Sequence, residues 1–263
     1  NGSATSLYAG SLWIAGLDVN NQLKCSAIRF RQKGNDFWTG PLTVDGTASI
    51  DAATCMEYDK MYNITRAEVD EFLAHCDERG IPHETEDWKI PTSILNWPAH
   101  GDPTRGMSYY LAPFYDNPGL NGELLDGVYN PADGDYPYYD VKNELCHTIT
   151  PTMEETMEGT VHGSILSDQV IKGDQTIWWV FNDKGNAHTE TGGSAIGMEI
   201  RAQAFAFATN DEINNMTFYS YEIINRSTYT LTNTYFSPWT DVDLGYSKDD
   251  YVGCDVSRGL GYG

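Results

Sequence analysis

Basic residues are scarce in this sequence. Its 16 lysines and arginines stand against 38 aspartates and glutamates, so the formal net charge at pH 7 is −22. Binding to nucleic acid or to an anionic membrane surface depends on clustered lysine and arginine side chains that neutralise phosphate groups. The composition therefore argues against nucleic-acid partners. It favours a soluble extracellular protein in which bound divalent cations relieve part of the repulsion among carboxylates.

Long apolar runs are also absent. No stretch approaches the roughly 18 apolar residues of a membrane span, and residues 1–15 lack a basic segment followed by an apolar one. We therefore expect no membrane insertion and a mature chain. The final residues, RGLGYG, read as an unfinished segment, so we also expect this to be the N-terminal part of a longer protein.

Complete catalytic and zinc motifs are missing as well. The five cysteines form no CxxC pair, no HExxH is present, and Ser194 lacks the spacing of a GxSxG nucleophile. An odd number of cysteines leaves at least one thiol unpaired within the chain, while the others form disulfides or remain free. These absences favour a protein that is not an enzyme.

Alternating β-prone segments are what the sequence does contain. Residues 7–17 and 23–32 flank an Asn-Asn turn and predict a hairpin, and residues 176–183 form an aromatic, β-branched run. Two further alternating segments, 216–227 and 229–239, follow the strand expected over 197–211 and are joined by a short turn. We expect all-β architecture, an antiparallel β-sandwich of Ig-like or jelly-roll type with long acidic loops.

One amphipathic helix is predicted over residues 66–79. Thr65 is a good N-cap, Glu68 stands at the capping-box position, and Gly80 is a natural residue to follow the helix. Val69 and Phe72 begin an apolar face with helical spacing. We expect one β-rich domain over 1–263, or two subdomains of about 1–112 and 113–263.

The stretch Asp126 to Pro137, DGVYNPADGDYP, holds oxygen ligands two to four residues apart around glycine-permitted turns. Hard cations such as Ca²⁺ require ligands of this kind. The alternative is a turn held only by side-chain hydrogen bonds to the backbone and by tyrosine packing.

Several phrases, including ILNWPAHGDP, DGVYNPADGDYP, WWVFNDKGNAHTETGG and DLGYSKDDYVGCD, together resemble a family of large secreted Bacteroidota proteins. Members of that family usually carry a C-terminal sorting domain for type IX secretion. The resemblance covers nearly the whole chain and implies export to the cell surface or the extracellular space. It supplies a location rather than an activity.

The resemblance also implies a calcium loop close to that of a dockerin or EF-hand. Asp126 matches the fifth loop position, Gly127 the turn position, Val128 the backbone-carbonyl position, Asn130 the ninth and Asp133 the twelfth. Gly122 and Leu124 stand where the first two ligands belong, so this part of the loop departs from the pattern. The residues that could replace the missing ligands are Asp116, Asn117, Asn121, Glu123 and Asp135.

A second cation site is suggested near the C-terminus. Asp241 and Asp243 are two residues apart and would share one face of a strand, although a solvated acidic loop explains them equally. Glycoside hydrolysis also uses paired carboxylates, but no spacing singles out such a pair.

Two further groups have plain structural explanations. His188 and Glu190 lack a third metal ligand, which favours a polar loop with a hydrogen-bonded histidine. A group of tyrosines around the acidic region could form a glycan-binding face or simply pack over the sheet: Tyr109, Tyr110, Tyr115, Tyr129, Tyr136, Tyr138 and Tyr139.

We therefore expect a non-enzymatic, calcium-stabilised extracellular protein: an adhesin, a surface-layer piece or a subunit of an extracellular filament. Its partners would be other surface proteins or copies of itself. The alternatives are an accessory domain of a secreted hydrolase and a carbohydrate-binding module with glycan partners.

Overall fold

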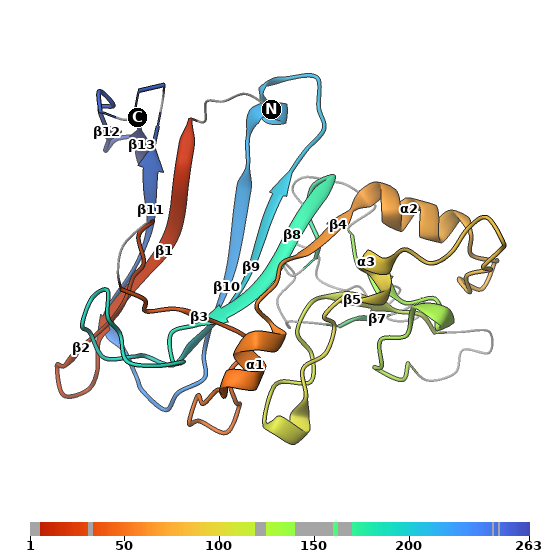
Figure 1. Ribbon diagram of the computed structural model, residues 1–263, viewed down its shortest axis with the longest axis horizontal. Helices are drawn as coiled ribbons and strands as arrows, with labels where there is room; N and C mark the ends of the chain where they lie inside the picture. Colours follow the sequence, from red (N-terminus) through yellow and green to blue (C-terminus); the bar gives the residue numbers. More distant parts are fainter. Residues whose placement is uncertain are drawn as a thin grey trace. The chain divides into compact units, whose positions relative to one another are not determined.

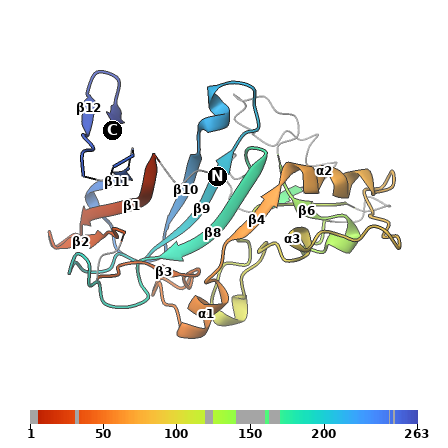
Figure 2. The same ribbon diagram turned by 45° about the horizontal axis from the view of Figure 1, so that its top comes forward.

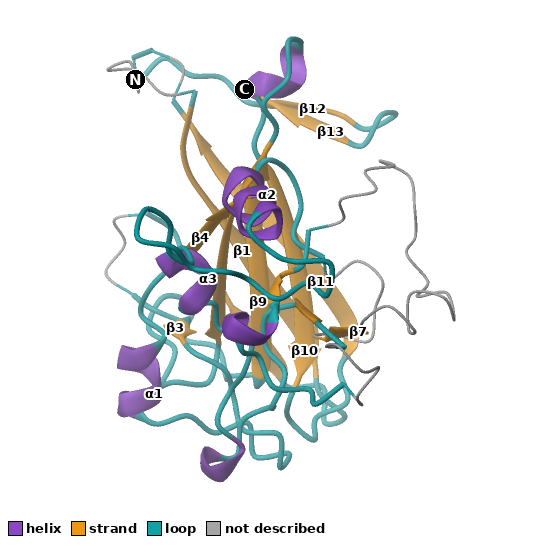
Figure 3. Cartoon of the chain, turned by 90° about the vertical axis from the view of Figure 1, so that its right-hand side faces the viewer, coloured by secondary structure: helices purple, strands orange, loops and turns teal. Residues whose placement is uncertain are grey.

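The computed structural model describes residues 6–30, 34–118, 125–139, 160–162, 170–243, 245–246 and 248–263. These residues are mainly β, and the ladders between their strands are antiparallel. Three short α-helices interrupt the strands: α1 (Ala52–Glu57), α2 (Arg66–Ala74) and α3 (Thr92–Leu95). Figure 3 shows how small the helical share is. The expected all-β, sandwich-like class is confirmed.

The chain divides into two compact units, and each is assembled from separate segments. The first contains residues Asn1–Trp38, Asp183–Gly197 and Ser227–Gly263, and the second contains Thr39–Asn182 and Met198–Arg226. The boundary expected near residue 112 falls inside the second unit. The cause is long-range pairing, which joins strands from distant parts of the sequence within one unit.

The first unit contains a three-stranded sheet in the order β11-β1-β2, made of β1 (Leu7–Leu17), β2 (Leu23–Ser26) and β11 (Thr232–Val242). The predicted hairpin is confirmed, since Ile14 pairs with Ser26 and Leu17 with Leu23. Its turn is built as the sequence suggests, with Asn21 at φ 58°. A separate hairpin, β12 (Gly253–Asp255) and β13 (Leu260–Tyr262), lies near the C-terminus (Figures 1 and 3).

The second unit is organised around a five-stranded sheet. β8 (Gln175–Asn182), β9 (Met198–Ala206) and β10 (Phe218–Asn225) lie side by side in Figures 1 and 2. The short strands β3 (Trp38–Thr39) and β4 (Tyr62–Thr65) both join β8. A second sheet has the order β6-β5-β7, from β5 (Phe114–Asp116), β6 (Tyr136–Pro137) and β7 (Thr160–His162). The remaining elements are the 3₁₀ turns η1 (Pro103–Arg105), η2 (Pro131–Asp133) and η3 (Glu212–Asn215).

The described residues of the second unit form a large apolar cluster between these elements. Its largest fully buried side chains include Trp178 of β8, Phe72 of α2 and Phe114 of β5. Trp178 contacts Tyr62 and Trp97, with ring centroids 5.9 and 6.2 Å apart. Burial of aromatic rings of this size is a large stabilising contribution.

One strand pairing differs from the sequence prediction. The segments 216–227 and 229–239 were expected to be neighbours across a short turn, but β10 pairs with β9 and β11 pairs with β1. Phe236 of β11 lies opposite Ile14, and Pro238 lies opposite Leu12. A short connection permits a hairpin but does not require one, because the partner of a strand is decided by packing along its whole length.

Helix α2 begins where the capping residues predict and ends earlier than expected. Thr65 accepts a hydrogen bond from the Glu68 backbone N–H, and the Glu68 carboxylate accepts one from the Thr65 backbone N–H. The helix stops at Ala74, before the predicted end at residue 79. The Asp77 carboxylate accepts hydrogen bonds from the Arg79 and Ile81 backbone N–H groups, so residues 77–81 form a separate turn in which Gly80 has φ 79°.

Replacing Thr65 by alanine is expected to lower the free energy of unfolding by about 1 kcal/mol, because one orphan N–H at the start of α2 loses its acceptor. Urea denaturation followed by circular dichroism measures this loss. Thr65→Ser keeps the hydroxyl and serves as the matched control. Equal losses in the two variants would mean that the cap is not the cause.

Candidate functional site

The acidic stretch predicted as a calcium loop forms a tight, irregular turn in the second unit. Asn130 caps η2 by accepting a hydrogen bond from the Ala132 backbone N–H. Gly127 has φ 70° and Gly134 has φ 101°, a region that favours glycine. A side chain at Gly134 would also meet the Gly80 carbonyl oxygen at 2.3 Å. The positive φ at Gly127 matches the sharp turn that the sixth position of a calcium loop requires.

Two of the loop carboxylates are almost completely buried. Asp116, at the end of β5, and Asp135 are each 2% exposed. The two oxygens of Asp135 accept hydrogen bonds from the backbone N–H groups of Asn117 (2.8 Å) and Asn130 (2.7 Å). One oxygen of Asp116 accepts from the Gly127 N–H at 2.8 Å. These bonds tie β5 to the turn.

The carboxylates also act on one another. Burial raises the pKa of Asp135 to about 7, against the two backbone hydrogen bonds that lower it, and the charges of Asp116 and Asp126 raise it further. Asp126 is exposed and accepts a hydrogen bond from the Val128 backbone N–H at 2.7 Å. Asp135 therefore takes up a proton much more readily than an exposed aspartate, because its carboxyl group is buried beside other acidic groups.

Five of the predicted ligands are brought together here: Asp116, Asp126, Asn130, Asp133 and Asp135. Asp133 and Asn130 interact directly, with the Asn130 Nδ2 donating to Asp133 Oδ2 at 2.5 Å. The Val128 side chain is exposed. Glu123 and Asn121 lie outside the described residues.

The described residues do not form a complete metal-binding site. Within them, no three histidine, cysteine, aspartate or glutamate side chains are grouped in a way that could hold a metal ion. Both carboxylate oxygens of Asp135 and one of Asp116 accept hydrogen bonds from backbone N–H groups instead. Cation binding here would use their remaining lone pairs together with amide and main-chain oxygens.

The second predicted site, Asp241 and Asp243, is not on one strand. Asp241 lies in β11 opposite Ala9, whereas β11 ends at Val242 and the Asp243 backbone N–H donates to the Ser6 carbonyl oxygen. Asp243 therefore lies just beyond the strand on which the pair was expected to share a face. No third metal-ligating side chain joins them in the part of the chain that the structure describes.

Six of the seven tyrosines around the acidic region lie in or pack against the core of the second unit. Tyr136 and Tyr139 are buried in it, and the rings of Tyr115, Tyr136 and Tyr138 stack on one another. The Tyr129 hydroxyl donates to the Ile94 carbonyl oxygen at 2.7 Å. None of the seven tyrosine side chains is exposed, which favours ordinary packing over a glycan-binding face.

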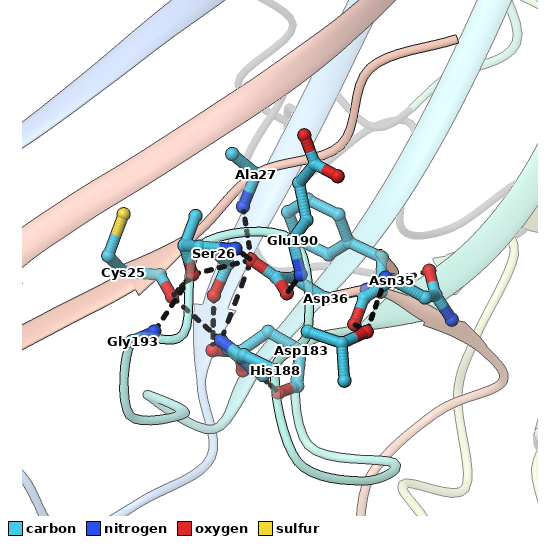
Figure 4. A network of polar contacts seen from close by, with 12 residues as sticks. Cys25, Ser26, Ala27, Asn35, Asp36, Asp183, His188, Glu190 and Gly193 are labelled. Atoms are coloured by element: carbon cyan, nitrogen blue, oxygen red, sulfur yellow. Dashed lines mark hydrogen bonds and ion pairs between the residues drawn. The ribbon is translucent and has the colours of Figure 1, made fainter. Parts of the chain in front are cut away.

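A second polar cluster lies in the first unit, around His188 (Figure 4). Asp36, Asp183 and Ser26 are fully buried there, and the His188 side chain is 0% exposed. Asp183 accepts hydrogen bonds from the Ser26 hydroxyl (2.7 Å) and the Ile196 and Gly197 backbone N–H groups (2.6 and 2.8 Å). The expectation of a polar loop with a hydrogen-bonded histidine is confirmed.

Asp36 accepts several of the hydrogen bonds in this cluster. It accepts from the backbone N–H groups of Ala27, Glu190 and Thr191 and from the Thr191 hydroxyl. Burial alone would raise the pKa of Asp36, but these hydrogen bonds and the nearby His188 hold it below its ordinary value. Nothing in the neighbouring sequence distinguishes Asp36 from the other aspartates.

Comparisons with family models, with curated proteins and with solved structures found no match for this chain. In the described part of the chain, no helix is both long enough and apolar enough to cross a membrane.

Proposed function

We propose that this protein is a non-enzymatic extracellular structural or adhesive protein whose acidic turn is stabilised by Ca²⁺. The observation that carries the proposal is the convergence of Asp116, Asp126 and Asp135, two of them buried, on a turn with a positive φ at Gly127. Export by the type IX route and assembly with surface proteins or further copies belong to this proposal. They follow from the resemblance described above.

Calcium would act by neutralising carboxylates that the fold forces together. Asp126, Asn130 and Asp133 lie on the exposed side of the turn and would supply oxygens to an incoming ion. Asp116 and Asp135 hold the backbone of β5 and of residues 127–130 in place through the hydrogen bonds described above. A ligand that binds only the folded state stabilises it by mass action, by about 2.7 kcal/mol at 100 times its Kd.

A carbohydrate-binding function has less support from this geometry. Six of the seven tyrosines that would form the binding face are packed in or against the core, and Tyr109 stacks on His100. The hydrolase alternative needs a carboxylate pair across an accessible site, and the carboxylates of the acidic turn are engaged with backbone N–H groups. We therefore retain the structural and adhesive proposal.

Thermal melting in Ca²⁺ and in EDTA tests the cation. We expect Ca²⁺ to raise the melting temperature and EDTA to reverse the rise, and Asp126→Asn to weaken the rise because it removes one charged oxygen ligand. Asparagine keeps the acceptor for the Val128 N–H.

The control is Asp211→Asn, which makes the same change at an exposed aspartate that caps η3. This variant should respond to Ca²⁺ as the unaltered protein does. Identical melting temperatures in Ca²⁺ and EDTA would exclude the calcium role. Light scattering of the Ca²⁺-loaded protein tests assembly, and a strict monomer would count against it.

A further inference from the structure

The two ring nitrogens of His188 both face backbone carbonyl oxygens. Nδ1 lies 2.7 Å from the Cys25 carbonyl oxygen, and Nε2 lies 2.6 Å from the Asp183 carbonyl oxygen. A carbonyl oxygen can only accept a hydrogen bond, and a neutral imidazole carries one N–H. A neutral His188 would therefore place a nitrogen lone pair against a carbonyl oxygen at hydrogen-bonding distance in a buried site, which is repulsive.

The surrounding charges favour a second proton on this ring. Asp36 Oδ2 lies 3.9 Å from His188 Nδ1, and both side chains are 0% exposed. Asp183 is a second buried carboxylate in the same cluster. Glu190, on the loop that carries His188, is paired with Arg29 at 2.6 Å. The neighbouring Cys25 thiol has a raised pKa, chiefly because it is buried and then because of the Asp36 charge, so it stays neutral.

We propose that His188 is a doubly protonated imidazolium in the folded protein and that this protonation stabilises the fold of the first unit. Its two N–H groups tie β2, through Cys25, to the residue that follows β8, Asp183. Its charge offsets that of Asp36, which in turn holds residues 27, 190 and 191 by their backbone N–H groups. Figure 4 shows His188 placed among these groups. The role is independent of calcium in the acidic turn, which lies in the other unit.

The sign of the pH dependence follows from proton uptake on folding. An unfolded histidine titrates near pH 6.5, whereas the proposed folded state keeps the proton above that pH. The contribution of His188 to the free energy of unfolding is therefore largest below about pH 6.5 and is lost as the pH rises. While the folded state retains the proton, the unfolding equilibrium constant contributed by His188 grows about tenfold per pH unit.

Nitrogen-15 NMR of the histidine rings in the intact protein tests the protonation state directly. At pH 7.5 we expect both His188 nitrogens to show the shifts of protonated nitrogens. His100 is the internal control, because its Nε2 accepts the Tyr129 backbone N–H at 2.8 Å while Nδ1 lies 3.1 Å from the Tyr109 carbonyl oxygen. It should therefore show one protonated and one unprotonated nitrogen. A His188 ring with one unprotonated nitrogen at pH 7.5 would overturn the proposal.

Denaturation between pH 6.5 and 8.5 tests the linkage. His188→Gln, which carries no titrating ring, should lose the roughly tenfold increase per pH unit that His188 contributes to the unfolding constant. If the variant has the same pH dependence as the unaltered protein, the proposed stabilisation by protonated His188 is contradicted. If this variant does not fold, the NMR measurement on the unaltered protein decides the question by itself.

Discussion

Replacing Glu199 by glutamine is expected to lower the free energy of unfolding of the second unit by about 3–5 kcal/mol, the usual loss when one member of a buried ion pair is removed. Glu199 is fully buried in β9. Its carboxylate accepts hydrogen bonds from Arg201 Nε at 3.0 Å, from Arg226 Nη2 at 2.9 Å and from the Leu42 backbone N–H at 3.0 Å. When the Glu199 charge is removed, Glu222, at 3.7 Å, is the one carboxylate partner left to the buried Arg201 among the described residues.

Urea denaturation monitored by tryptophan fluorescence measures this loss. Glu57→Gln is the control, because it removes the same charge from a surface pair with Arg105 and should change stability little. Comparable effects in the two variants would contradict the assignment of Glu199 to the core.

The same residue predicts an acid dependence. Burial alone would raise the pKa of Glu199, but the charges of Arg201 and Arg226 and the hydrogen bonds to its carboxylate hold it below its ordinary value of 4.5. A depressed pKa contributes stability above the unfolded value and loses it as the pH falls through the folded one. Unfolding of Glu199→Gln should therefore depend less steeply on pH below about 4.5.

Truncation of Trp178 to alanine is expected to cost about 3–5 kcal/mol, because the site cannot collapse around the missing indole. Trp178 is 1% exposed in β8, the central strand that joins β9 on one side and β4 on the other. Its ring contacts those of Tyr62 and Trp97. Chemical denaturation followed by far-UV circular dichroism measures the change.

Trp178→Phe keeps an aromatic ring and should cost clearly less than the alanine variant. Similar losses in both would mean that the strand, rather than the volume of the indole, is what the mutation disturbs.

The local elements of this fold could be predicted from the sequence because their causes are local. The capping box at Thr65 and Glu68 starts α2, and the Asn-Asn turn closes the β1–β2 hairpin. Alternating residues mark both ends of β8 and the start of β9 to within one residue, whereas β9 ends at Ala206, five residues before the expected end. Each of these features depends on neighbours only a few positions away.

The buried charges on β9 could not be predicted from local sequence patterns. In a strand, Glu199, Arg201 and Gln203 point to the same face, and all three of these polar residues are buried. The Arg201 guanidinium donates to the carbonyl oxygens of Leu111 and Tyr110, which come from a loop about 90 residues away. Period-2 spacing identifies a face but not what covers it.

The composition predicts an acidic turn here, and in the structure the aspartates Asp116 and Asp126 act electrostatically on Asp135. Which oxygens they use is a different matter. Asp116 enters the turn from β5, ten residues before Asp126, and its burial follows from the packing of that strand. Asp135 and Asp116 are engaged by backbone N–H groups, a result that spacing alone does not distinguish from cation ligation.

By itself, the sequence determined the β class, the acidic character, the helix start and the presence of a polar turn rich in aspartate. Those properties follow from residue type and short-range periodicity. Only the tertiary structure decided that β1 pairs with β11, that Glu199 and Arg201 are buried, and that His188 lies between the carbonyl oxygens of Cys25 and Asp183. The physical reason is that burial and pairing are properties of contacts between residues far apart in the chain. A side chain of the same type is hydrated at an exposed position and loses its water at a buried one.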